Sequence, residues 1–173
     1  MEIPSMNSEL KRYLVPPVRF ALSHLNKPFD LAAVAQTAIA TGHVEIDLIG
    51  ATLDLDHPKV SSKVDSWNIK HDNLDKINIR RFSTIEELKK NSPNLRVIGT
   101  VVRGGDNAFN FEWKPNDIII IGGANGLSRH DLKYVDELVT IPTTPETNFL
   151  TVSTVIPVLT YHILSQRKLW DKV

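Results

Sequence analysis

The sequence lacks several features on which specialised sites and environments depend. None of its 173 residues is a cysteine, which excludes disulfides, thiolate metal ligands and cysteine nucleophiles together. The six histidines show no paired spacing and no H-E-x-x-H motif, so we expect no metal site. No apolar run approaches the roughly eighteen residues of a membrane helix, and the N-terminus does not read as a signal peptide. We therefore expect a cytoplasmic protein without a metal and without a membrane partner.

An excess of charge of either sign is also missing. Lysine and arginine together number 20, as do aspartate and glutamate, so no overall field attracts nucleic acid. An RNA partner would have to be recognised by a local basic patch. With 42% hydrophobic residues the chain can bury a real core, and its length fits a single domain, residues 1–173.

Predicted strands and helices alternate along the chain, which indicates an α/β fold with a mostly parallel sheet flanked by helices. Asp30 is the predicted N-cap of the first helix and Gly42 its stop. A capping box at residues 83–86 opens a later helix, and Pro157 falls near the first turn of the last one. The predicted strands are 18–24, 44–49, 95–102 and 118–121, and the predicted helices are 30–41, 58–65, 83–90 and 153–167.

Two glycine-rich turns follow predicted strands, at residues 103–106 and 122–126. Ligands of open α/β sheets bind at the carboxyl ends of the strands, so both turns are candidate ligand loops. Neither turn has the G-x-G-x-x-G spacing of a dinucleotide site, and no Walker motif is present. The alternative interpretation is that each turn, taken alone, only connects a strand to the next element and binds no ligand.

Several segments carry a resemblance to a known family. The C-terminal third contains IIIIGGANGLS at residues 118–128 and IPTTPETNFLTVS at residues 141–153, followed by an apolar helix. Near the N-terminus, residues 19–42 contain RFAL and PFDLAAVAQTA before Gly42. Together these segments resemble the SPOUT methyltransferases, in particular their TrmH (SpoU) branch and its TrmJ and TrmL types. The resemblance extends from about residue 18 to residue 167.

The resemblance implies an α/β knot with a C-terminal deep trefoil knot, which would occupy about residues 95–167 after an N-terminal extension of residues 1–16. It also implies a homodimer that uses S-adenosyl-L-methionine to methylate a ribose 2'-hydroxyl of tRNA or rRNA. Backbone groups of three loops would hold the cofactor. The positions in this sequence that match are Thr100, Val101, Gly122, Ile141 and Leu150.

At side-chain positions the sequence departs from the family pattern. Gln36 stands where the family has a reaction-centre arginine, and glutamine carries no charge and cannot act as a base. Ala124 lies near the position of a family glutamate, and Thr151 replaces an asparagine, whereas Ser153 keeps the residue type. Asp30 and Ala32 likewise replace the asparagine and glycine of the first motif.

Two functional hypotheses follow from these departures. In the first, the protein is an active RNA methyltransferase, with Arg103 and Ser153 as candidate catalytic residues. Positive charge would then come from Arg103, from Arg19 or from the pair at residues 80–81. In the second, it is a catalytically diverged SPOUT homodimer that acts as an RNA-binding or assembly protein.

Overall fold

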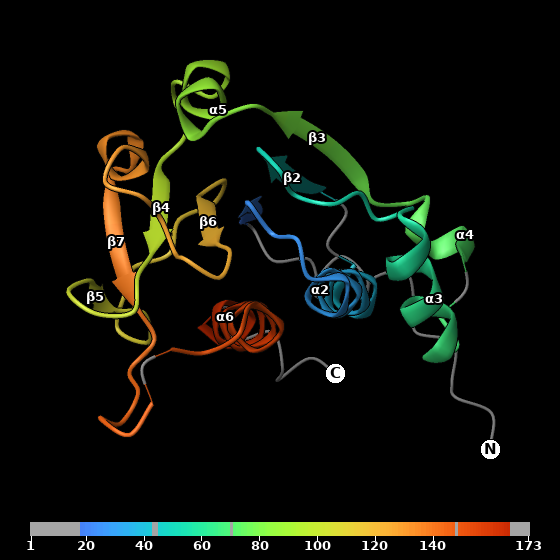
Figure 1. Cartoon of the computed structure of the whole chain (residues 1–173). Coiled ribbons are helices and arrows are strands. Elements are labelled where there is room, and N and C mark those ends of the chain that lie inside the picture. The colour runs from blue at the N-terminus through green and yellow to red at the C-terminus, as the bar shows by residue number, and fades with distance from the viewer. Residues whose placement is uncertain (1–17, 43–44, 70, 148, 167–173) are drawn as a thin grey trace.

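A seven-stranded sheet in the order β3-β2-β1-β6-β4-β7-β5 forms the centre of the molecule (Figure 1). The computed structural model describes residues 18–42, 45–69, 71–147 and 149–166. Every strand pairing is parallel, which confirms the predicted α/β class. The strands are β1 (Arg19–Ser23), β2 (Glu45–Ile49), β3 (Asn78–Phe82), β4 (Val97–Thr100), β5 (Asp106–Asn107), β6 (Ile118–Gly122) and β7 (Glu137–Thr140).

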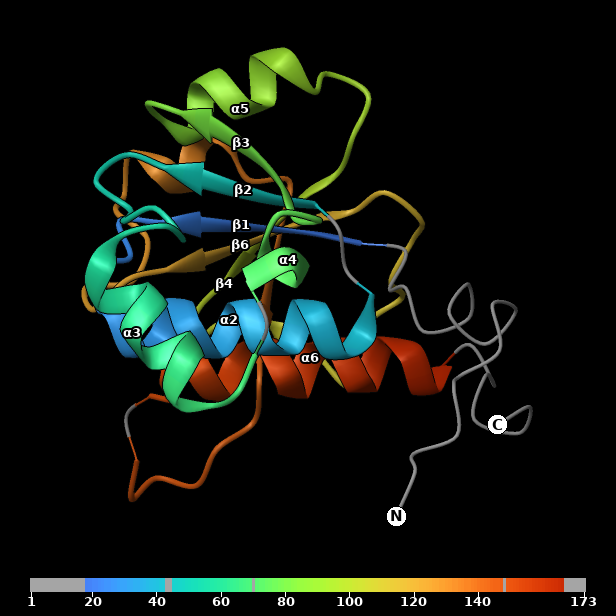
Figure 2. The same cartoon turned by 90° about the vertical axis from the view of Figure 1, so that its right-hand side faces the viewer.

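Helices cover both faces of the sheet. Helices α2, α3, α4 and α6 lie on one face, and α5 lies on the other beside the short 3-10 helix η1 (Figures 1 and 2). No helix in the described ranges is long and apolar enough to cross a membrane. Their bounds are α2 (Pro28–Thr41), α3 (Pro58–Ser66), α4 (His71–Leu74), α5 (Ile85–Asn91), η1 (Asp131–Tyr134) and α6 (Val152–Gln166).

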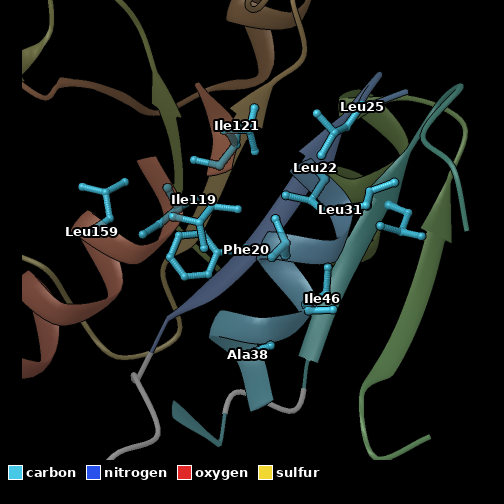
Figure 3. Close-up of a cluster of buried hydrophobic side chains, with 14 of the residues drawn as sticks. Phe20, Leu22, Leu25, Leu31, Ala38, Ile46, Ile119, Ile121 and Leu159 are labelled. Atoms are coloured by element: carbon cyan, nitrogen blue, oxygen red, sulfur yellow. The ribbon is translucent and has the colours of Figure 1, made fainter. Parts of the chain in front are cut away.

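The four consecutive isoleucines of β6 are buried on both sides of the sheet. Ile119 and Ile121 join the cluster under α2 and α6, where Leu159 of α6 also packs (Figure 3). Ile118 and Ile120 belong to the cluster under α5. A strand covered on both faces needs apolar residues at every position. The apolar run therefore forms a central strand, as the sequence predicts, and its end is held firmly in the middle of the sheet.

Helix α2 begins earlier than the sequence indicates. It starts at Pro28, with Lys27 as N-cap and without a side-chain cap, so the prediction that Asp30 is the N-cap was wrong. Proline suits a first turn because its φ is fixed and its missing N–H would have no helical partner. Asp30 lies in that first turn, where negative charge interacts favourably with the helix dipole. Gly42 ends the helix with φ 67°, as predicted.

Helix α5 and strand β3 also differ from expectation. The N-cap of α5 is Thr84, whose hydroxyl accepts a hydrogen bond from the N–H of Glu87 at 3.1 Å. The Glu87 carboxylate in turn accepts from the N–H of Ser83 at 2.6 Å, so the capping interactions lie one residue later than predicted. Strand β3 was not predicted, because its sequence NIRRF is polar and forms the edge of the sheet.

Helix α6 packs beside α2 under the sheet (Figure 2). It begins at Val152, and Pro157 lies inside it, just beyond the first turn near which the sequence predicts it. A proline there leaves the carbonyl of Ser153 without its helical partner. Burial of Ile156, Leu159 and Ile163 keeps the helix in place despite this loss.

The connection from β4 to β5 crosses over β7. Strand β7 pairs with β4 on one side and with β5 on the other, although β4 and β5 are joined by only residues 101–105. A Cβ atom on Gly105 would lie 2.7 Å from the carbonyl carbon of Val139, so the crossing needs a glycine. The trefoil knot itself stays a prediction, and the extension at residues 1–16 lies outside the described residues.

Candidate functional site

Both predicted glycine turns lie at the carboxyl edge of the sheet, after the neighbouring strands β4 and β6. The turn after β6 is tightly closed, since the N–H of Gly126 donates to the carbonyl of Gly123 at 2.9 Å. A Cβ atom on Gly122 would lie 2.6 Å from the carbonyl carbon of Gly126, and Gly126 has φ 66°. Both glycines are therefore required by the shape of the turn.

A cavity opens at this edge, and four separate segments of the chain line it. It encloses about 1010 Å³ of empty space when its open mouth and the adjoining solvent are included. Its wall is mostly apolar, with a few backbone and side-chain polar groups. The lining residues are Leu25, Asn26, Lys27, Asp30, Thr100, Val101, Val102, Ile121, Gly122, Gly123, Ala124, Gly126, Ile141, Thr143, Phe149, Leu150, Thr151, Val152 and Val155.

All five predicted cofactor residues line this one cavity: Thr100, Val101, Gly122, Ile141 and Leu150. Two of them already use polar groups inside the protein. The Thr100 hydroxyl donates to the carbonyl of Ile120 at 2.9 Å, and the Val101 N–H donates to the carbonyl of Val139 at 2.9 Å.

Backbone groups remain available on the opposite wall. Within the described ranges, the main-chain N–H and C=O groups of Ile141 and Leu150 form no hydrogen bond. Both residues are half-buried beside the cavity, where unpaired main-chain groups favour a ligand that pairs with them. The edge of an adenine base presents suitable donors and acceptors, so these residues fit an adenosine-containing cofactor.

Two charged side chains of the lining were missed by sequence reasoning. Lys27 and Asp30 come from the start of α2, and Asp30 is only 7% exposed. They reach the cavity because α2 begins directly beyond the carboxyl end of β1, which pairs with β6. The match of Asp30 to the first family motif was the available signal, but its predicted role as an N-cap obscured it.

The two candidate catalytic residues, Arg103 and Ser153, do not line the cavity, and neither does Gln36 at the family arginine position. Gln36 is exposed on α2, and Arg103 is exposed on the crossing between β4 and β5. The hydroxyl of Ser153 lies 2.9 Å from that of Thr151, which does line the cavity. Ala124 also lines it and offers no polar side-chain atom. Arg103 is nevertheless close along the chain to Val102, a lining residue.

The other arginines considered as sources of charge are held by carboxylates. Arg80 binds the buried carboxylate of Asp47 with two hydrogen bonds of 2.8 Å, and Arg19 approaches the same group at 3.3 Å. The hydrogen bonds that Arg80 donates to the Asp47 carboxylate raise the pKa of the Arg80 guanidinium. Arg81 is bound to Asp54. Arg19 and Arg80 therefore stabilise the sheet, because moving either guanidinium away would leave the buried negative charge of Asp47 less well paired.

Metal ligands are not gathered anywhere in the described part of the chain. No group of three or more histidine, aspartate or glutamate side chains is placed to hold an ion there. The polar chemistry of the cavity thus consists of backbone groups, hydroxyls, the Asn26 carboxamide, and the charges of Lys27 and Asp30.

Solved structures with a similar fold include three RNA-related proteins. One, described as "Structural insights into the 2-OH methylation of C/U34 on tRNA", has a TM-score of 0.73 and 20% identity over 87% of this chain and 96% of that chain. AviRb from Streptomyces viridochromogenes, a SpoU methyltransferase in complex with AdoMet, has a TM-score of 0.74 and 19% sequence identity. The match covers 96% of this chain and 64% of that chain. An RNA 2'-O ribose methyltransferase has a TM-score of 0.72 and 24% sequence identity, and the match covers 88% of this chain and 58% of that chain.

These likenesses show the fold, and the chain spans less than two thirds of the latter two proteins. No curated protein matches the chain. The model of the SpoU rRNA Methylase family matches residues 17–161, which include all strands of the sheet and the whole cavity lining. On this match, the chain belongs to the SpoU rRNA methylase family.

Proposed function

We propose that this protein is an S-adenosylmethionine-dependent RNA methyltransferase that modifies a ribose 2'-hydroxyl of tRNA or rRNA in the cytoplasm. The observation that carries the proposal is the convergence of the five family-matched residues on one cavity at the carboxyl edge of β4 and β6. These residues are up to 50 positions apart along the chain, from 100 to 150, so their convergence depends on the fold. Membership of the SpoU family supplies the reaction class.

Different parts of the cavity wall would make different contacts with the cofactor. Ile141 and Leu150 would pair with the adenine edge through backbone groups, and the tight turn at residues 122–126 lets the main chain approach the ligand closely. The apolar wall excludes water from the reacting atoms. When bound, the cofactor supplies an electrophilic methyl group on a sulfonium. The 2'-hydroxyl oxygen would bond to the methyl carbon as the carbon–sulfur bond breaks, which would release the thioether S-adenosylhomocysteine, and the hydroxyl proton would pass to a base or to water.

RNA would be held at the mouth of this cavity. Lys27 is exposed and lines the cavity, and Arg103 forms no side-chain hydrogen bond or ion pair within the described residues. Both can therefore bind phosphate oxygens without first breaking an internal ion pair. Ser153 stays a candidate for the proton transfer only through Thr151, which it contacts at the cavity wall.

Among SpoU proteins we propose the TrmJ and TrmL types as the nearest. The tRNA C/U34 protein is covered over 96% of its length, whereas AviRb is covered over only 64%. We propose that the single domain formed by residues 1–173 takes part in RNA recognition itself. Residues 95–167 would form the knotted cofactor-binding region.

A specific observation favours the second candidate, a catalytically diverged SPOUT homodimer that binds RNA or assists assembly. Gln36, which stands at the family arginine position, is uncharged and exposed, and it does not line the cavity. Ala124 and Thr151 line the cavity at two other degenerate positions. Such a protein would keep the cofactor cavity but lack the groups that accelerate transfer.

Methyl transfer to RNA separates the two candidates. The protein is incubated with labelled S-adenosylmethionine and with total tRNA or rRNA, and the digested nucleosides are analysed. A labelled 2'-O-methyl nucleoside supports the enzyme. Cofactor and RNA binding without labelled nucleoside supports the diverged protein. Absence of cofactor binding at millimolar concentration contradicts the enzyme outright.

The homodimer is part of the same proposal. Large apolar side chains are exposed near α6 and α2, including Tyr161 at 42%, Phe109 at 40% and Phe29 at 54%. Aromatic residues of this kind anchor protein interfaces. Light scattering at micromolar protein should give twice the 19.4 kDa chain mass. A single-chain mass would contradict the dimer without affecting the cofactor site.

A further inference from the structure

The cavity contains one carboxylate, and it lacks a partner. Asp30 lines the wall at the start of α2 and is 93% buried, with 7% of its surface exposed. Within the described residues its side chain forms no hydrogen bond and no ion pair. Lys27 also lines the cavity, yet the two side chains are not bridged. Its place in the first turn of α2 gives the carboxylate a favourable interaction with the helix dipole, but no side chain or backbone group of the described residues pairs with it.

The other buried aspartates of the described ranges show the contrast. Asp47 is bound by Arg80 through two hydrogen bonds, and Asp117 is bound by Arg96 through two hydrogen bonds of 2.9 and 2.6 Å. Both complete their ion pairs inside the protein. Asp30 alone of the three lines this cavity, where its acceptor oxygens can meet a ligand that enters it.

We propose that Asp30 is the counter-ion for a positively charged group of S-adenosylmethionine, which is either its sulfonium or its α-ammonium. This inference rests on the proposed function. A cation beside Asp30 would be attracted strongly, because the buried site is poorly screened by solvent. The sulfonium loses its charge when the methyl group leaves, whereas the ammonium keeps it. A sulfonium partner would therefore make Asp30 favour the cofactor over the demethylated product.

Calorimetric titration of three ligands against matched variants tests the counter-ion. S-adenosylmethionine carries both cations, S-adenosylhomocysteine carries only the ammonium, and 5'-methylthioadenosine carries neither. Asp30→Asn removes the charge and keeps the shape of the side chain. Asp30→Ser replaces it in the titrations if Asp30→Asn does not fold. Asp75→Asn is the control, because Asp75 is exposed and lies outside the cavity lining.

We expect Asp30→Asn to weaken S-adenosylmethionine binding by about tenfold or more and to leave 5'-methylthioadenosine binding unchanged. An equal loss for S-adenosylhomocysteine identifies the ammonium as the partner, and no loss for it identifies the sulfonium. Asp75→Asn should bind all three ligands like the wild type.

Two results would overturn the counter-ion. Unchanged S-adenosylmethionine affinity in Asp30→Asn would show that the charge is not used. An equal loss for all three ligands would show that Asp30 only shapes the cavity. Either result leaves the proposed function standing, because that function fails instead if the wild type does not bind S-adenosylmethionine.

Discussion

Asp30 and Gln36 lie on the same helix but meet different surroundings. Asp30 is buried in the first turn of α2 and lines the cavity, whereas Gln36 is exposed farther along the helix. The position that the family resemblance assigns to the reaction centre thus carries neither charge nor a place in the cavity wall. Under the proposed function, positive charge for RNA would come from Lys27 in the cavity lining and from Arg103, which follows the lining residue Val102.

We expect Arg103→Ala to weaken RNA binding to a similar extent for all RNA sequences. The slope of log K against the logarithm of the salt concentration should fall in magnitude by about one. The reason is that its exposed guanidinium, which has no internal partner in the described ranges, would bind a phosphate. Fluorescence anisotropy with labelled tRNA at several salt concentrations measures both effects. Lys63→Ala, an equal charge change on α3, is the control. Equal losses in the two variants would exclude a specific role for Arg103.

At the scale of the element, the sequence predicts those helix ends and strands that depend only on neighbouring residues. Gly42 ends α2 because only a residue tolerant of left-handed φ fits there, and the sequence predicts this correctly. Strand β3 was missed because pairing with β2 holds its polar residues in a strand. Such pairing depends on residues far away in the sequence, so no local pattern reveals it.

The start of α5 gives an element-scale prediction. Thr84→Ala should lower the free energy of unfolding by about 1 kcal/mol, because the N–H of Glu87 loses its acceptor. Ser83→Ala should change it by less than about 0.5 kcal/mol, since the Ser83 residue contributes its backbone N–H to the cap. Urea denaturation measures both values. A larger loss in Ser83→Ala than in Thr84→Ala would place the cap at the residue that sequence reasoning favoured.

At the scale of the whole molecule, the cavity is a product of the fold. Its wall combines residues from the start of α2, the end of β4, the turn after β6 and the loop before α6. The family resemblance predicted five of the lining residues, because it assigns them to cofactor loops. Lys27 and Asp30 were not predicted as lining residues, because their position follows from how α2 leaves the sheet.

The crossing of β7 by residues 101–105 gives a prediction at the same scale. Gly105→Ala should lower the free energy of unfolding by roughly 2 to 3 kcal/mol, because its Cβ would collide with the backbone of β7. Gly104→Ala meets nothing within 4 Å and should cost only about 1 kcal/mol, through its φ of 84°. Urea denaturation compares the two. Equal losses would contradict the close crossing.

Binding of S-adenosylmethionine at the carboxyl edge of β4 and β6 is the central claim, and calorimetry on two neighbouring variants tests it most directly. Ala124 lines the cavity, whereas the adjacent and exposed Asn125 does not. We predict that the wild type and Asn125→Trp bind S-adenosylmethionine equally and that Ala124→Trp, which fills the cavity, binds at least about tenfold more weakly. No binding to the wild type at millimolar ligand, or equal binding by Ala124→Trp, would contradict the account.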